Sequence, residues 1–187
     1  MSKLTKIELP LQNLMLVERN HLSDERGFFV RLFCANELGI AGWTKPIQQI
    51  NFTHTKHKGS VRGLHFQNNP FSEMKMVTCL QGSVFDVAVD LRPESETFLH
   101  WHGEILSLAN KRSLIIPEGF AHGFQALDDD CELLYFHSEP YDQPSEEGIL
   151  FDDQKIGISW PIEITEVSKR DKSHHPLDSN FKGVICK

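Results

Sequence analysis

Short runs that alternate between apolar and other residues constrain the fold of this 187-residue chain more than any other feature. The clearest run, SVFDVAVDL, covers residues 83–91. Successive side chains of a strand point to opposite faces, so Val87 and Val89 share one face while Asp86 and Asp90 share the other. The valine face is typical of a core. The other face combines carboxylates with small residues, which indicates the lining of a pocket.

Similar runs, broken by Gly, Pro, Asn and Asp, continue along the chain. They predict strands at Leu14–Arg19, Phe28–Leu32, Gln48–Thr53, Met76–Gln81, Gly103–Leu108, Ser113–Ile116 and Glu132–His137. One helical turn is expected at Ala35–Leu38. Many short strands with turn signals indicate an all-β sandwich or barrel. The length fits a single domain, residues 1–187, and the polar segment from about residue 172 is expected to extend across the surface or a neighbouring subunit.

Charge and hydropathy exclude two classes of partner. The chain has 19 Lys plus Arg against 26 Asp plus Glu, so its formal net charge of −7 lacks the basic excess that nonspecific binding to nucleic acid or anionic membranes requires. No apolar run approaches the roughly 20 residues that span a bilayer, and the first residues lack a signal-peptide pattern. The four cysteines form no CxxC pair. We therefore expect a reduced, cytoplasmic protein in which Cys79 and Cys131 are buried apolar residues.

Three segments carry side chains suited to acid–base chemistry, and the first is RGLH at residues 62–65, followed by Lys75. In a regular strand Arg62 and His65 point to opposite faces, unless a bulge at Gly63 redirects them. A surface arginine and a partly buried, hydrogen-bonded histidine are the simpler alternative.

The second segment is a Pro-x-Gly turn that leads to His122, which lies between Ala121 and Gly123. These small neighbours leave room for a ligand or another backbone. The PxGxxH spacing resembles the second motif of cupin barrels, although a core histidine explains it as well.

The third segment is ELLYFH, in which Tyr135 shares a face with Leu133 and His137. Tyr135 and Tyr141 are the only tyrosines, against 13 phenylalanines, so a phenol is used sparingly here. A tyrosine that anchors a sheet edge through its hydroxyl is the alternative.

The ten histidines raise the question of a metal site. The only HxH pair, His100 and His102, lies in a stretch rich in loop residues with no third ligand nearby, and His174 and His175 lie in the polar segment. Zinc requires three or four well-placed ligands. We therefore predict no metal site and expect these four histidines to face solvent.

The motifs also occur together in a recognisable order: DERGFF (24–29), QINFT (49–53), SVRGLHFQ (60–67), KMV (75–77), GSVFDVAVDLR (82–92), IPEGFAHGF (116–124), ELLYF (132–136), ISWP (158–161) and SKRD (168–171). From about residue 10 to residue 175, this order resembles the dTDP-4-dehydrorhamnose 3,5-epimerase family. The resemblance implies a cupin-like β-barrel or jelly roll with a few short helices. It also implies a homodimer that needs no metal or cofactor and acts on nucleotide-linked 4-keto-6-deoxyhexoses.

The resemblance assigns roles to the motif residues. His65 matches the base, Asp171 the carboxylate that orients it, and Tyr135 the general acid that returns a proton from the opposite face. This assignment is chemically sensible, because a C–H beside a ketone is a weak acid and the enolate formed on its deprotonation needs charge stabilisation. The residues that would stabilise the enolate oxygen are Lys75, Arg62 and His122.

The substrate-binding positions complete the assignment. Those that match the nucleotide and pyrophosphate end are Arg26, Gln49, Asn51, Glu146 and Arg170. We add Arg31, which stands where the family usually has Glu, and Tyr141, which follows Pro140 where the family commonly has paired tyrosines. Phe52 replaces a residue that is more often polar. Because Arg31 and Phe52 lie on the nucleotide side, both dTDP and CDP carriers stay open.

Several functions remain possible at this stage. The first is epimerisation at C3 and C5 of a dTDP-4-dehydro-6-deoxyglucose-type substrate, and the second is epimerisation at a single carbon. A 4-keto-sugar isomerase is disfavoured by RGLH together with ELLY, and a non-catalytic sugar-nucleotide-binding barrel by the intact His65–Tyr135 pair. In the homodimer, an N-terminal segment could be exchanged so that Arg26 reaches the neighbour's site.

Overall fold

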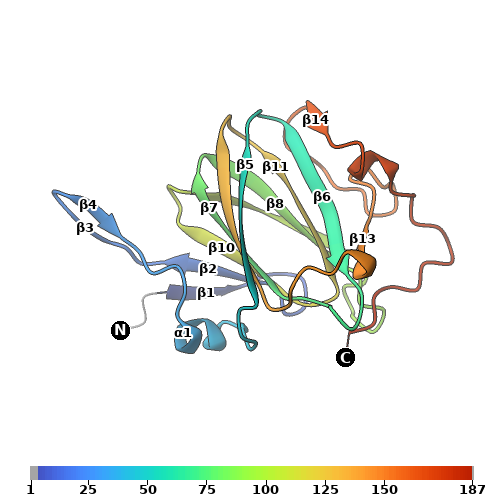
Figure 1. The fold of residues 1–187 in the computed structure, drawn as a ribbon, viewed down its shortest axis with the longest axis horizontal. Helices are drawn as coiled ribbons and strands as arrows, with labels where there is room; N and C mark the ends of the chain where they lie inside the picture. Colours follow the sequence, from blue (N-terminus) through green and yellow to red (C-terminus); the bar gives the residue numbers. More distant parts are fainter. Residues whose placement is uncertain (1–3, 187) are drawn as a thin grey trace.

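The computed structural model describes residues 4–186, and β-strands dominate it (Figure 1). One sheet has the order β1-β2-β10-β7-β12-β5, formed by Leu4–Glu8, Met15–Arg19, Arg112–Ile116, Lys75–Gln81, Cys131–His137 and Gln49–Thr55. A second sheet has the order β13-β6-β11-β8-β9, formed by Glu146–Gly148, Ser60–Gln67, Phe120–Ala126, Ser83–Asp90 and Trp101–Ser107. Strand β14 (Glu166–Val167) pairs with β6 in parallel. The two sheets pack together, which confirms the predicted all-β, cupin-like architecture.

The remaining elements are short. Strands β3 (Leu22–Asp24) and β4 (Gly27–Phe29) form a hairpin that projects away from the two sheets (Figure 1). Helix α1 covers Ala35–Ile40, and two 3₁₀ helices, η1 and η2, cover Gln143–Ser145 and Asp171–Ser173. Within residues 4–186, no helix is long and apolar enough to cross a membrane.

The alternating pattern of β8 explains how the layers pack. Val84 and Ala88 point between the sheets, where they join a core cluster with Leu16, Leu133 and Phe124. The other face of β8 is buried as well, because Val87 and Val89 belong to a second cluster with residues of the C-terminal segment. A third cluster, under α1, covers the outer face of the first sheet. Strand β8 is therefore buried on both faces.

Most predicted strands are confirmed, with shifts of a few residues at their ends. The strand predicted at Phe28–Leu32 is wrong, because the extended stretch ends at Phe29 and forms the short projecting hairpin. The helical turn predicted at Ala35–Leu38 is confirmed and extends to Ile40. Cys79 and Cys131 are buried in the core, as expected.

One histidine and the C-terminal segment also differ from expectation. His102 lies in β9 rather than in a loop; it is half-buried, and its Nε2 is 3.1 Å from Glu104 Oε1. The segment from residue 172 extends across the surface as expected, but some of its side chains make apolar contacts with the second sheet. Val184 is buried against the second sheet, and its backbone N–H donates to the carbonyl of Leu91.

Candidate active site

A cavity of about 730 Å³ lies between the two sheets and the C-terminal segment. Side chains from β5, β7 and β12 of the first sheet face side chains from β6 and β11 of the second sheet across it. It collects most of the predicted site residues: Gln49, Asn51, Arg62, His65, Lys75, His122, Tyr135, Tyr141, Glu146, Arg170 and Asp171.

A histidine–aspartate pair stands on the β6 side of the cavity. His65 Nε2 lies 2.8 Å from Asp171 Oδ1, while the other carboxylate oxygen accepts a 3.2 Å hydrogen bond from the Gly63 N–H. Burial raises the pKa of Asp171, but the hydrogen bond from His65, its charge and the Gly63 N–H outweigh burial, so the pKa lies below its ordinary value. Asp171 is therefore an ionised acceptor that fixes the orientation of the imidazole.

An irregularity in β6 brings Arg62 and His65 to the same cavity. The pairing of β6 with β11 shifts register between His122 and Phe124, opposite Gly63, which has a φ of +109°. A Cβ on Gly63 would lie 2.6 Å from the Cα of Gly123. Both glycines are needed for this close approach, which confirms the redirection at Gly63 that the sequence left open.

The floor of the cavity carries a second histidine–carboxylate pair. His122 Nε2 lies 2.8 Å from Asp86 Oδ1, and both residues are buried. Burial raises the pKa of Asp86 more than the nearby charges of His122 and Lys75 lower it. The face of β8 that we predicted to line a pocket therefore does place Asp86 beside the site. Asp90, on the same face, instead binds Arg92 and has a structural role.

Tyr135 lies beside this pair, on the opposite sheet. Its ring stands edge-on to His122, with 5.8 Å between ring centroids. Burial raises the pKa of the phenol above its ordinary value, and the negative charge of Asp86 adds to the effect. The Tyr135 hydroxyl consequently retains its proton at neutral pH and can act as a proton donor.

A buried carboxylate that the sequence reasoning missed holds the cavity lysine. Glu73 Oε1 lies 3.2 Å from Lys75 Nζ, and Glu73 Oε2 lies 2.7 Å from His137 Nδ1. Lys75 Nζ also donates to the His65 carbonyl at 3.3 Å. Burial raises the pKa of Glu73, but the charge of Lys75 and the hydrogen bond from His137 outweigh it, so the pKa is lowered. The alternation of side chains along a strand could have indicated Glu73 and His137 as site residues. Glu73 precedes Lys75 by two positions, and His137 follows Tyr135 by two, so each pair would share one face.

The rim of the cavity is a connected polar network. The Tyr141 hydroxyl donates to Glu146 Oε2 at 2.8 Å, and Arg170 Nη2 lies 2.6 Å from Glu146 Oε1. Gln49 accepts a hydrogen bond from the Tyr141 backbone N–H and donates to Asn51. This network leaves a guanidinium and amide groups available to a polar, anionic part of a ligand.

Two predicted binding residues lie away from this cavity in the described chain. Arg26 is at the tip of the β3–β4 hairpin, almost fully exposed, and pairs with Asp24. Arg31 pairs with Glu37 of α1. Neither residue is among those that line the cavity of its own chain.

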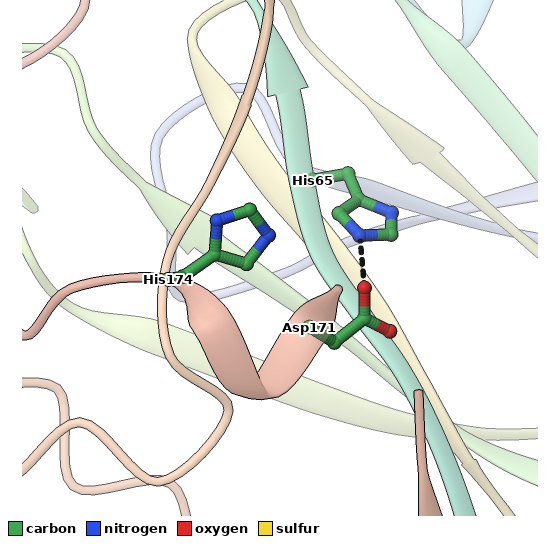
Figure 2. A group of neighbouring side chains, drawn as sticks. All are labelled: His65, Asp171 and His174. Atoms are coloured by element: carbon green, nitrogen blue, oxygen red, sulfur yellow. Dashed lines mark hydrogen bonds and ion pairs between the residues drawn. The ribbon is translucent and has the colours of Figure 1, made fainter. Parts of the chain in front are cut away.

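The expectation that His174 faces solvent is wrong. Its ring lies near His65, with 6.0 Å between ring centroids (Figure 2). The ring also packs against Gly148, where a Cβ would come within 2.4 Å of His174 Nε2. His174, His65 and Asp171 each offer a metal-ligand atom, and these atoms lie within 4.8 Å of one another. Among the described residues, this is the one such cluster.

Comparison with known proteins identifies the family. A family model described as dTDP-4-dehydrorhamnose 3,5-epimerase matches residues 8–179. A dTDP-4-dehydrorhamnose 3,5-epimerase from Shigella flexneri is 42% identical over 167 residues, which are 89% of this chain and 91% of that protein.

Solved structures agree with this assignment. A dTDP-6-deoxy-D-glucose-3,5-epimerase from Legionella pneumophila, in complex with dTDP-4-keto-L-rhamnose, has a TM-score of 0.91 and 36% identity, covering 98% of this chain and 100% of that chain. A dTDP-4-dehydrorhamnose 3,5-epimerase from Bacillus anthracis, with TDP and PPi bound, has a TM-score of 0.90 and 36% identity, covering 93% and 99%. The chain therefore belongs to the dTDP-4-dehydrorhamnose 3,5-epimerase family.

Proposed function

We propose that this protein epimerises a dTDP-4-keto-6-deoxyhexose at C3 and C5, converting dTDP-4-dehydro-6-deoxyglucose to dTDP-4-dehydrorhamnose. The observation that carries the proposal is that His65, paired with Asp171, and the protonated Tyr135 belong to opposite sheets and line one cavity. Inversion at carbon requires a base and an acid on opposite sides of the substrate. The family assignment and the ligand of the Legionella relative support the substrate class.

His65 acts as the base. Its Nε2–H donates to Asp171, so Nδ1 carries the lone pair that can accept a proton from the carbon beside the ketone. As the imidazolium forms, the ionised Asp171 stabilises its positive charge across the same 2.8 Å contact. The ketone of the substrate takes up the electron pair as an enolate, so the reaction needs no cofactor.

The enolate oxygen is stabilised by cations and hydrogen-bond donors at the cavity wall. Lys75 brings an ammonium group that Glu73 and the His65 carbonyl orient. His122, fixed by Asp86, and Arg62, fixed by Thr55, lie in the same cavity. Preorganised donors of this kind stabilise developing charge more strongly in a partly buried site than in water.

Tyr135 returns the proton on the other face. Its raised pKa keeps the phenol protonated until the enolate forms nearby, and the enolate is a strong enough base to take the proton. Repetition of the same two steps at the second carbon flanking the ketone accounts for double epimerisation.

The rim network binds the nucleotide diphosphate. Arg170 supplies a positive charge for the pyrophosphate, and Glu146 holds it in place. Gln49, Asn51 and Tyr141 supply the hydrogen-bonding groups beside it. We propose thymidine as the base, because both solved relatives described above hold thymidine nucleotides.

The protein functions as a homodimer in this proposal. The β3–β4 hairpin exposes Leu22, Phe28 and Phe29, which are 51–63% accessible, on an arm that contacts little of its own chain (Figure 1). Burying these residues against a second copy would carry Arg26 toward the partner's cavity. Light scattering should then give twice the 21.4 kDa of one chain, and a mass of one chain would contradict the dimer.

The direct test is solvent deuterium exchange followed by NMR. The protein is incubated in heavy water with dTDP-4-keto-6-deoxyglucose generated in situ, and in parallel with the CDP-linked sugar. Exchange at C3 and C5 of the dTDP sugar supports the proposal. Exchange at one carbon indicates a single-site epimerase, and nucleotide-sugar binding without exchange indicates a binding barrel; both results contradict double epimerisation.

A further inference from the structure

His174 stands beside the proposed base without a role in the reaction described above. It follows η2, three residues after Asp171, so the short 3₁₀ helix places both side chains on the same side as His65 (Figure 2). Its Nε2 is buried and has no hydrogen-bond partner among the described residues. A buried ring nitrogen without a partner is costly, which makes it a candidate for binding something other than the protein.

The space for this ring is built into the fold. Gly148 of β13 provides it, because a Cβ there would lie within 2.4–2.8 Å of three atoms of the His174 ring. The ring is therefore held against the backbone of β13 on one side and faces His65 and Asp171 on the other.

We propose that His65, Asp171 and His174 form a site for a zinc-like divalent transition metal that inhibits the enzyme. Two imidazoles and one carboxylate are the donor set of three-ligand zinc sites, in which a fourth position is open, whereas magnesium and calcium prefer oxygen ligands. Tetrahedral zinc with bonds of about 2.0–2.1 Å places its ligand atoms roughly 3.3 Å apart. The three ligand atoms here lie within 4.8 Å of one another, so shifts of an ångström or so would complete the site.

Metal binding and base catalysis exclude each other at this site. Nε2 of His65 donates a hydrogen bond to Asp171 in the active form. When Nε2 binds the metal instead, its proton moves to Nδ1 and Asp171 becomes a ligand. His65 then has no lone pair left to accept the substrate proton, so the ion stops the reaction without contacting the sugar.

The surroundings provide a route for a cation. His174 lines a second cavity of about 560 Å³, together with Glu147, Asp178 and Glu146, and Glu146 also lines the substrate cavity. These carboxylates favour a divalent ion, although Arg170 neutralises part of the charge of Glu146. A metal could therefore reach the site from the side of the C-terminal segment.

The test compares three full-length proteins after removal of metal: wild type, H174A, and the control H175A, which alters the exposed neighbouring histidine. Zinc binding is measured by calorimetry, and cobalt binding by the visible absorption of tetrahedral Co²⁺. We expect one ion per wild-type chain and the same affinity in H175A. Loss of a ligand in H174A should weaken binding by at least 10- to 100-fold and abolish the tetrahedral spectrum.

Inhibition provides the second readout, and it rests on the proposed function. Zinc should stop deuterium exchange in wild type and H175A, with recovery on addition of EDTA. H174A should keep its basal exchange and require at least 10-fold more zinc. Unchanged zinc and cobalt binding in H174A, or equal losses in H175A, would overturn the site. If no protein catalyses exchange but the cobalt spectrum still depends on His174, the proposed function fails while the metal site stands.

Discussion

Replacement of Asp171 by Asn tests the histidine–aspartate pair at nearly constant volume. The two Asp171 oxygens accept from different donors, Oδ1 from His65 Nε2–H at 2.8 Å and Oδ2 from the Gly63 N–H at 3.2 Å. An amide has only one acceptor oxygen. In either orientation its NH₂ group therefore faces an N–H donor, and the negative charge that stabilises the imidazolium is lost.

The size of the effect follows from the hydrogen bond to the charged ring. Such bonds contribute about 1.5–3 kcal/mol. Since each 1.36 kcal/mol changes a rate tenfold, D171N should lower kcat for epimerisation by about 10- to 150-fold. The KM should change little, because Asp171 acts through His65 rather than on the nucleotide.

The assay is the initial rate of deuterium incorporation into dTDP-4-keto-6-deoxyglucose. Asp152→Asn provides the matched control, because Asp152 is exposed and lies outside the cavity lining. It should behave as wild type. A D171N rate within about twofold of wild type, for a protein with unchanged melting temperature, would refute the proposed role of the pair.

Three further predictions concern the walls of the cavity. Glu73→Gln removes the buried partner of Lys75, so the free energy of unfolding should fall by about 3–5 kcal/mol; a loss under 1 kcal/mol in urea titrations would contradict this. Gly63→Ala should cost about 2–5 kcal/mol because its Cβ meets the backbone of β11, whereas Gly39→Ala, in open space on α1, should be neutral or stabilising. Burial raises the pKa of Tyr135 above 10, so the phenol stays protonated at high pH. The kcat should therefore show no loss from phenol ionisation up to pH 10. A fall of kcat that begins below pH 9 in the wild type and is absent in a phenylalanine variant would contradict this prediction.

Sequence periodicity was sufficient for most of the fold, because strands with one or two buried faces leave a clear pattern. It failed at Phe28–Leu32, where apolar residues belong to an exposed hairpin rather than to a sheet of the barrel. An exposed apolar arm and a buried strand have similar local sequences. Only contacts beyond the segment distinguish them.

The site shows a similar limit. His65 and Asp171 are 106 residues apart, and no local pattern connects them; the family resemblance did so. Glu73 and His137 were missed because their contact depends on the register between β7 and β12, which sets His137 opposite Lys75. His174 was misread because composition suggested a solvated tail, whereas η2 turns its ring toward His65.

The central claim is that His65 and Tyr135 act from opposite walls of one cavity. The most direct measurement compares wild type with Tyr135→Phe and records, by NMR, both deuterium incorporation and the configuration at C3 and C5. The wild type should incorporate deuterium at both carbons and invert them. The variant should still exchange protons through His65 but form the inverted sugar at least 100-fold more slowly. Inversion at the wild-type rate in the variant, or the absence of exchange in the wild type, would contradict the account.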